Sequence, residues 1–224
     1  MIDLNTRDEE LAAYIRKQLV CGFWDYDDVR ESVLSHAEDA GDISADTATA
    51  LLNSMWDERV AEQESWPDTG DFGRLEQMFA QLESQGILGR MCFTCCNTCA
   101  FDAIDDERTP TDDANQLYPY REWAYVSFHA QDASHLGAQD PLLYLAYSAW
   151  THHAQLPGEL ADAASRGEET AMRESVERTE VLLGQQIVAA ARSSGLTAQW
   201  SGSRHERVSL QIRDWRKPLP SRDV

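Results

Sequence analysis

The sequence predicts an α+β fold: a helical N-terminal part, then a mixed, mostly antiparallel sheet of about four or five strands packed by helices. Two observations carry this prediction. Apolar residues recur at helical spacing through residues 6–85, with capping residues and glycines between the runs. From residue 87 onward, short apolar runs of strand length alternate with helical stretches. Helices that precede strands in this way are typical of the α+β class.

Four helices are expected in the N-terminal part. A capping box of Thr6 and Glu9 predicts the start of the first helix, and Gly22 predicts its end. Asp25 and Ser44 are expected to cap the second and third helices, because such side chains accept hydrogen bonds from backbone N–H groups of the first turn. The fourth helix has the clearest apolar pattern, formed by Phe72, Leu75, Phe79 and Leu82.

Strands are expected after residue 86. A strand over 87–93 is followed by a short helix that begins at Thr94 and runs to Ile104, and residues 105–119 are expected to form an exposed loop. A strand is expected over 123–129, with Ala124, Val126 and Phe128 on one face, and a second strand over 142–149 is expected to be buried on both faces. A helix follows over about 168–194. The chain then closes with a hairpin whose strands lie near 196–200 and 208–212.

Residues 1–70 are expected to form the helical part and residues 71–220 the α+β part, packed together as one continuous domain. A chain of 224 residues is long enough to bury a sizeable core in this way. Neither an internal repeat nor a low-complexity linker divides the sequence.

The net charge of −20 restricts the partners that this protein can have. It repels phosphate backbones and anionic lipids, so we expect neither nucleic acid nor a membrane surface as a partner. The charge is uneven: acidic residues outnumber basic ones 20 to 7 in residues 1–90, whereas basic residues outnumber acidic ones 6 to 3 in residues 195–224. The acidic front could pair with the basic tail, or it could face a basic partner protein.

The compartment is expected to be the cytoplasm. The N-terminal residues show neither the basic stretch nor the apolar stretch of a secretory signal. No apolar run approaches the roughly 20 residues that a membrane-spanning helix needs. The five cysteines are therefore expected to be reduced, and an odd, clustered set also argues against a disulfide framework.

Four of the five cysteines fall within eight residues, at the junction between the helical part and the strands: Cys92, Cys95, Cys96 and Cys99. Three interpretations of this cluster stay open. The first is a set of small buried side chains, because free cysteine is among the most buried residue types. The second is a metal site, with zinc as the possible ion. The third is thiol chemistry near a helix N-terminus, where the thiol pKa is lowered.

The spacing of the cysteines bears on the metal interpretation. Cys92 and Cys95 form one Cys-x-x-Cys pair and Cys96 and Cys99 another, but no segment separates the two pairs. We expect that the adjacent Cys95 and Cys96 do not easily place both thiolates on one ion. Three cysteines with a distant histidine, such as His129 or His36, are the geometry that remains.

Secondary candidates follow the strand over 123–129. His129, Gln131 and Asp132 stand at its end, a place where functional groups often cluster, and a turn role is also expected for Asp132. Trp200 and Trp215 flank the closing hairpin and are expected to pack rather than to stack on bases, since the acidic chain lacks a basic groove. No phosphate-binding loop, nucleophile elbow or zinc-protease motif is present, which favours a protein that is not an enzyme.

Several short segments along most of the chain together resemble one known family. The most specific are Phe93-Thr-Cys-Cys-Asn-Thr-Cys99 and the closing hairpin from Gly195 to Arg216. The weaker matches are Gly22-Phe23, Trp66-Pro67, Leu82 to Gly86-Ile87, Gln131-Asp132 and Tyr144 to Tyr147. With these segments the chain resembles an uncharacterised bacterial family, domain of unknown function 6891. Cys92 looks like an addition to the family pattern, and Ala100 stands where the family has glycine. The resemblance implies the extent of the domain and no activity.

These observations favour a protein-interaction module over an enzyme. An acidic, compact protein without catalytic motifs fits a partner-neutralising role, such as immunity against a basic toxin. The alternative is a metal- or thiol-dependent protein centred on Cys95, Cys96 and Cys99.

Overall fold

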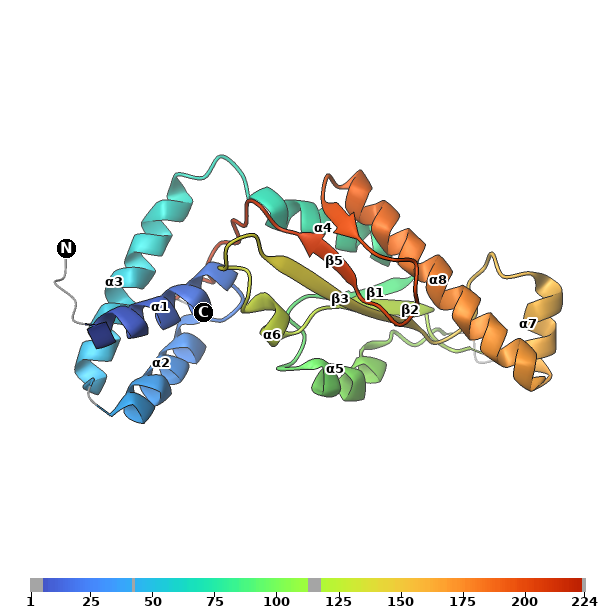
Figure 1. Ribbon diagram of the computed structural model, residues 1–224, viewed down its shortest axis with the longest axis horizontal. Helices are drawn as coiled ribbons and strands as arrows, with labels where there is room; N and C mark the ends of the chain where they lie inside the picture. The colour runs from blue at the N-terminus through green and yellow to red at the C-terminus, as the bar shows by residue number, and fades with distance from the viewer. Residues whose placement is uncertain (1–5, 42, 113–117, 223–224) are drawn as a thin grey trace. The chain divides into compact units, whose positions relative to one another are not determined.

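A computed structural model describes residues 6–41, 43–112 and 118–222, without the side chain of Thr6. It divides the chain into two compact units. The first contains the residues up to 73 together with 134–141 and those from 213 onward, and the second contains 74–133 and 142–212. The fold is α+β, as predicted, with helices first and a five-stranded mixed sheet after them (Figure 1). The expected packing of the two parts into one continuous domain stays a prediction.

The first unit is helical, and its helices begin where their capping residues predict. Asp25 accepts a hydrogen bond from the N–H of Asp28 (2.8 Å), and Ser44 accepts one from the N–H of Thr47 (3.1 Å). The first helix also begins at Thr6, although the predicted cap by the Thr6 side chain lies outside the described side chains. The helices are α1 (Thr6–Cys21), α2 (Tyr26–Ala40), α3 (Ala45–Glu64) and the first residues of α4 (Gly70–Glu83).

Trp56 lies in the core of the first unit and is 1% exposed. Its indole meets the ring of Tyr26 edge-on, with centroids 5.3 Å apart. Apolar residues of three helices and one from the C-terminal segment surround it: Leu11, Ile15, Leu19, Val29, Val33, Leu51, Leu52 and Leu219. The helical spacing of these residues in the sequence thus becomes one shared core.

The second unit is built on a sheet with the strand order β1-β2-β3-β5-β4. The parallel pair is β1 with β2, and the other neighbours are antiparallel, which confirms the predicted mixed, mostly antiparallel sheet. The closing hairpin is also confirmed, with β4 antiparallel to β5. The strands are β1 (Ile87–Arg90), β2 (Ala124–Ser127), β3 (Leu142–Ala149), β4 (Thr197–Gln199) and β5 (Val208–Gln211).

Two of the strand predictions need correction. The central strand β3 has the predicted bounds, but it is not buried on both faces: Leu143 and Leu145 are fully buried, whereas Tyr144 is 42% exposed. The first strand ends at Arg90 rather than at residue 93. It ends early because Cys92 and Thr94 have φ angles of 50° and 59°, which a strand cannot contain.

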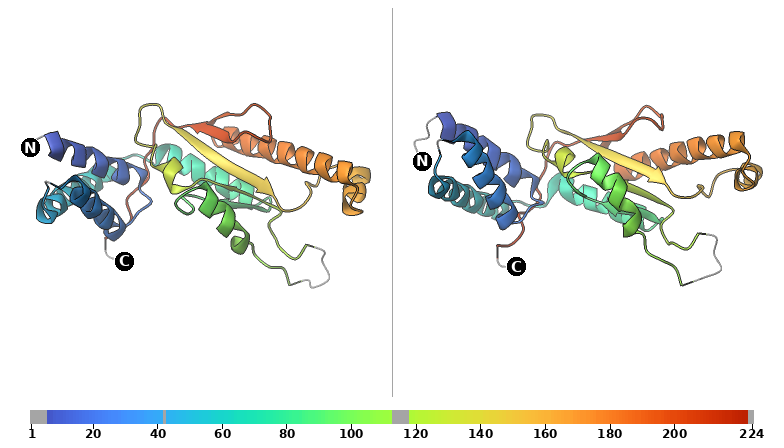
Figure 2. Two further views of the ribbon diagram at one scale, coloured as in Figure 1. Left: turned by 60° about the horizontal axis from the view of Figure 1, so that its bottom comes forward. Right: turned by 90° about the horizontal axis from the view of Figure 1, so that it is seen from below.

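Helices cover both faces of this sheet (Figures 1 and 2). The views show α4 and α8 (Glu169–Ser193) on one face and α5 (Asn97–Ala103) on the other. Phe79 of α4 meets Phe128 edge-on at 6.3 Å, and Ala124, Val126 and Phe128 are all buried on that face, as predicted. Because side chains alternate along a strand, Tyr125 and Ser127 belong to the face that α5 covers.

The remaining elements are short. They are η1 (Ile104–Glu107), α6 (Ala130–Ala133) and α7 (Gly158–Ser165). The predicted loop over 105–119 therefore starts as a 3-10 turn, and its residues 113–117 lie outside the described residues. Among the helices of the described ranges, none combines the length and the apolar character needed to cross a membrane.

Trp200 packs against α8 at Gly184. A Cβ atom added at Gly184 would lie 2.5 Å from Cζ2 of the Trp200 indole and 2.7 Å from Cη2. The indole N–H also donates to the carbonyl oxygens of Ser203 (3.1 Å) and Glu206 (3.2 Å), which fixes the ring. The close approach of α8 to the hairpin therefore requires glycine at this position.

The substitution Gly184→Ala is expected to lower the free energy of unfolding by about 2 kcal/mol, because the added methyl group overpacks against a rigid ring. This sign is opposite to the usual gain from alanine in a helix. Gly158→Ala in α7 is the matched control, since a Cβ there meets no atom within 4 Å. Urea unfolding of both variants tests this: equal stabilities would contradict the packing described.

Candidate functional site

The cysteines lie on the loop that connects β1 to α5. Backbone hydrogen bonds fasten this loop to the end of β2 and to α6: Phe93 N–H donates to Phe128 O (2.8 Å), Ala130 N–H to Thr94 O (3.0 Å), and Gln131 N–H to Cys95 O (3.3 Å). The loop is thus held by the segment that carries the secondary candidates predicted from the sequence.

The predicted helix start at Thr94 is wrong. Thr94 has a left-handed φ of 59°, and its hydroxyl donates to the carbonyl oxygen of Cys96 (3.2 Å). The helix begins two residues after Cys95, at Asn97, with Cys96 as the N-cap. Cys96 has an extended backbone with φ −151° and ψ 172°, so the chain turns into α5 at this residue.

Three cysteine sulfurs converge as a result. The Sγ atoms of Cys95, Cys96 and Cys99 all lie within 4.8 Å of one another. Cys99 Sγ is 3.4 Å from Cys95 Sγ and 3.6 Å from Cys96 Sγ. The expectation that the adjacent Cys95 and Cys96 do not easily bring both sulfurs to one point is therefore wrong. Cys99 stands three and four residues further on, about one helical turn away from both.

These three thiols are also accessible. Cys95 and Cys99 are exposed and Cys96 is partly exposed, so the interpretation of the cluster as small buried side chains is wrong. Cys92 is partly exposed as well, but it is not one of the three converging residues. All five cysteines are free thiols, and Cys21, in α1 of the first unit, is the buried one.

The converging thiols differ in acidity. The pKa of Cys96 is lowered, first by the backbone N–H of Cys99 and then by the neighbouring thiols, although the Cys96 side chain makes no full capping hydrogen bond. The pKa of Cys99 is raised to about 11, first by its hydrogen bonds with Cys95 and Cys96 and then by their charge. The cluster therefore favours a thiolate at Cys96 over one at Cys99.

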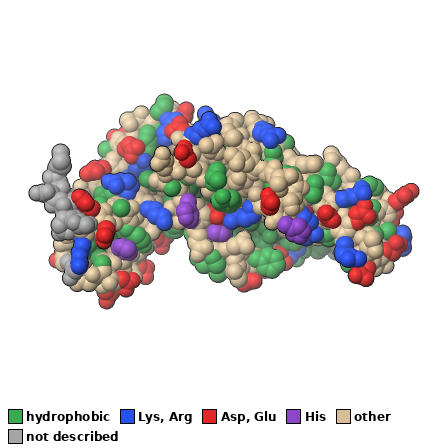
Figure 3. All heavy atoms as spheres, in the orientation of Figure 1, with side chains coloured by type: hydrophobic (Ala, Val, Ile, Leu, Met, Phe, Trp, Pro, Cys, Tyr) green, Lys and Arg blue, Asp and Glu red, His purple; other side chains and the backbone are tan. Residues whose placement is uncertain are grey.

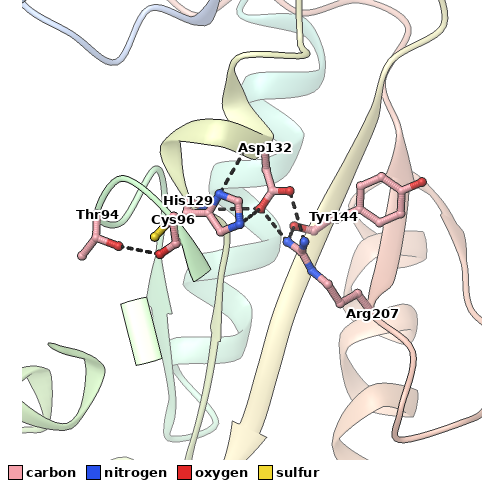
Figure 4. A network of polar contacts seen from close by, with 6 residues as sticks. All are labelled: Thr94, Cys96, His129, Asp132, Tyr144 and Arg207. Carbon is pink, nitrogen blue, oxygen red and sulfur yellow. Dashed lines mark hydrogen bonds and ion pairs between the residues drawn. The ribbon is translucent and has the colours of Figure 1, made fainter. Parts of the chain in front are cut away.

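A buried polar network stands beside this loop (Figure 4). Asp132 in α6 is 8% exposed and pairs with Arg207 through both carboxylate oxygens, at 3.2 and 2.5 Å. The guanidinium of Arg207 also donates to the carbonyl oxygen of Tyr144. Such a two-point pair fixes the loop before β5 against α6.

His129 belongs to the same network and not to the sulfur cluster. Its Nδ1 accepts from the N–H of Asp132 (3.2 Å), and its Nε2 lies 3.1 Å from Asp132 Oδ2. Burial lowers the pKa of His129, and the Asp132 carboxylate opposes this. The described residues therefore add no histidine to the three cysteines: both ring nitrogens of His129 face Asp132, and His36 stacks on Tyr14 in the first unit at 4.0 Å.

The structure brings together some of the predicted residues and adds one. His129 and Asp132 do meet at the end of β2, and Asp132 also accepts a local turn hydrogen bond from the N–H of His129 (3.4 Å). Gln131 contributes its N–H to the cysteine loop, and Trp200 packs on α8. Arg207 was missed, because it stands 75 residues beyond Asp132 and no local pattern marks it.

The three sulfurs could hold a metal ion. Thiolates are soft ligands that select zinc and other thiophilic ions. No carboxylate or imidazole of the described residues belongs to the group, so the cluster offers three protein ligands.

Comparison with known proteins places the chain in a family. A search of the curated proteins found no match, and neither did a search of the solved structures. A family profile matches residues 5–219, which is nearly the whole chain. This protein therefore belongs to the family described as "Domain of unknown function (DUF6891)".

Proposed function

We propose that this protein binds a thiophilic metal ion, with Zn²⁺ as the first candidate, through the thiolates of Cys95, Cys96 and Cys99. The observation that carries the proposal is the convergence of the three sulfurs within 4.8 Å. Thiolates that bind a tetrahedral zinc ion at about 2.3 Å lie roughly 3.8 Å apart. The separations of 3.4 and 3.6 Å are close to this value, so binding needs only small movements.

The site has the character of an open metal site. Closed structural zinc sites take four protein ligands, whereas sites with three leave one position for water or another ligand. Two of the three thiols are exposed, which gives an ion direct access from solvent. We therefore favour a protein that takes up and releases metal over one that needs the ion to fold. A reducing cytoplasm, in a bacterial host, suits this function because it keeps the thiols free.

A titration with Co²⁺ tests the proposal. The protein is expected to develop thiolate-to-metal charge-transfer absorption that saturates at one ion per chain. Protons are expected to be released on binding, because the pKa of Cys99 is about 11 and its thiol must lose its proton to become a ligand. Cys92→Ser serves as the control and should titrate like the wild type. Absorption that does not saturate, or that Cys92→Ser abolishes, would count against the three-cysteine site.

A second candidate is the binding of a basic protein, which the distribution of acidic residues favours. Acidic side chains gather over α2 in the first unit (Figure 3), where they surround a cavity of about 420 Å³. Its lining includes Asp28, Glu31 and Asp39. Binding of a basic partner there would weaken as salt is added. A pull-down from host extract at low salt, repeated with Glu31→Gln and Asp39→Asn combined, tests this; equal recovery with both proteins would contradict it.

A further inference from the structure

The opposite side of α5 from its cysteines forms part of a second site, which lies entirely in the second unit. A cavity of about 190 Å³ separates α5 from β2, β3 and the loop before β5. Polar side chains from all of these elements line it, among them Asn97, Tyr125, Ser127, Arg204 and Arg207, with Phe101 as an aromatic neighbour. This volume is below the 300–1,000 Å³ that is usual for drug-sized ligands, so the cavity suits a small molecule.

Ser127 is the strongest sign that the cavity binds something. The residue lines the cavity and is only 2% exposed, and within the described ranges its hydroxyl makes no hydrogen bond. The buried Nε of Arg207, in the same lining, also has no hydrogen-bond partner among the described residues, and native proteins seldom leave such a group unpaired. The amide of Asn97 and the hydroxyl of Tyr125 also line the cavity without a hydrogen-bond partner among the described residues. These groups are available to a ligand.

The charges in the cavity favour an anion. Arg204 Nε lies 2.7 Å from Glu180 Oε2 in an ion pair, and the two terminal nitrogens of Arg204 donate no hydrogen bond to the described residues. Glu180 and Asp132 balance one arginine each, and Glu206 is the carboxylate in the lining. The preference of the cavity for an anion therefore comes from the terminal N–H groups of Arg204, which are available as hydrogen-bond donors, rather than from the net charge of the lining. Guanidinium groups bind carboxylates and phosphates through two parallel hydrogen bonds.

We propose that this cavity binds a small anionic metabolite through its carboxylate or phosphate group. Arg204 binds the anionic group, and Asn97, Tyr125 and Ser127 donate further hydrogen bonds to the ligand. Phe101, which is 71% exposed at the rim, covers the carbon part of the molecule. The lining contains no cysteine, so this binding does not depend on the metal proposed above.

Isothermal titration of the full chain with inorganic phosphate, acetate and neutral glycerol tests this proposal. We expect saturable binding of phosphate or acetate with a dissociation constant of about 1 mM, and no binding of glycerol. The stronger of the two anions identifies the group on the ligand. Arg204→Gln is expected to weaken binding at least about tenfold, and Ser127→Ala severalfold.

Arg166→Gln is the matched control, because Arg166 also pairs with a glutamate but stands in the loop after α7, outside the cavity lining. It should bind the anion like the wild type. Ser127→Ala removes a hydroxyl without a described partner, so it should fold normally and keep the test decisive. The proposal is overturned if neither anion binds, if glycerol binds as well as the anion, or if Arg204→Gln and Arg166→Gln bind equally.

Discussion

Replacing Cys99 by serine is expected to lower the affinity for Zn²⁺ by about 100-fold or more. Cys99 Sγ lies next to the sulfurs of both Cys95 and Cys96. Its loss leaves two thiolates without the sulfur that both of them adjoin. Substitution of a residue that only hydrogen-bonds to a metal ligand typically lowers metal affinity about 10- to 100-fold. The loss of a ligand itself should lower it at least as much. Competition against a chelating dye, at a fixed pH with a thiol-free reductant, measures this affinity.

Cys92→Ser is the matched control for Cys99→Ser. It makes the same chemical change in the same loop, but Cys92 is outside the converging group. Its affinity for Zn²⁺ should stay within about threefold of the wild type, a change below 0.7 kcal/mol. If Cys92→Ser lost as much affinity as Cys99→Ser, four cysteines rather than three would make the site.

Replacing Asp132 by alanine is expected to lower the free energy of unfolding by about 3 kcal/mol. The carboxylate is 8% exposed and pairs with Arg207 through both oxygens, so its removal leaves a half-buried guanidinium without its counter-ion. The partial exposure of Arg207, at 35%, holds the cost to the lower end of the range for buried pairs. Urea unfolding at neutral pH measures the difference.

Two further variants separate this pair from ordinary surface pairs. Glu168→Ala breaks a pair with Arg166 in which both side chains are more than half exposed, and it should cost less than about 0.5 kcal/mol. In a double-mutant cycle, Asp132→Ala and Arg207→Ala should be coupled by about 1–3 kcal/mol. Additive effects of the two substitutions would show that the pair contributes nothing of its own.

Much of the fold follows from local signals in the sequence. Asp25 and Ser44 start their helices because a short polar side chain can accept from the first turn, and this needs no knowledge of the rest of the chain. The bounds of β3 follow from its apolar run. Its exposed Tyr144 could not be predicted in this way, because burial depends on which elements cover each face of the sheet.

The candidate site was predicted only in part, for reasons of backbone geometry and distance along the chain. The left-handed conformations of Cys92 and Thr94 turn the loop so that adjacent cysteines can meet Cys99, and such conformations are rare outside glycine. The spacing of the cysteines alone therefore argued against their convergence. Arg207 reaches Asp132 through the sheet order, which brings distant segments together without any local pattern.

Elemental analysis tests most directly the claim that Cys95, Cys96 and Cys99 bind a metal ion. The protein is purified without chelators and under reducing conditions, from its host or from a recombinant source. The three-cysteine site predicts close to one thiophilic metal ion per chain after addition of Zn²⁺ and gel filtration, and none in the variant with Cys95, Cys96 and Cys99 all changed to serine. Less than about a tenth of an ion per chain in the folded wild type, or equal metal in the triple variant, would contradict it.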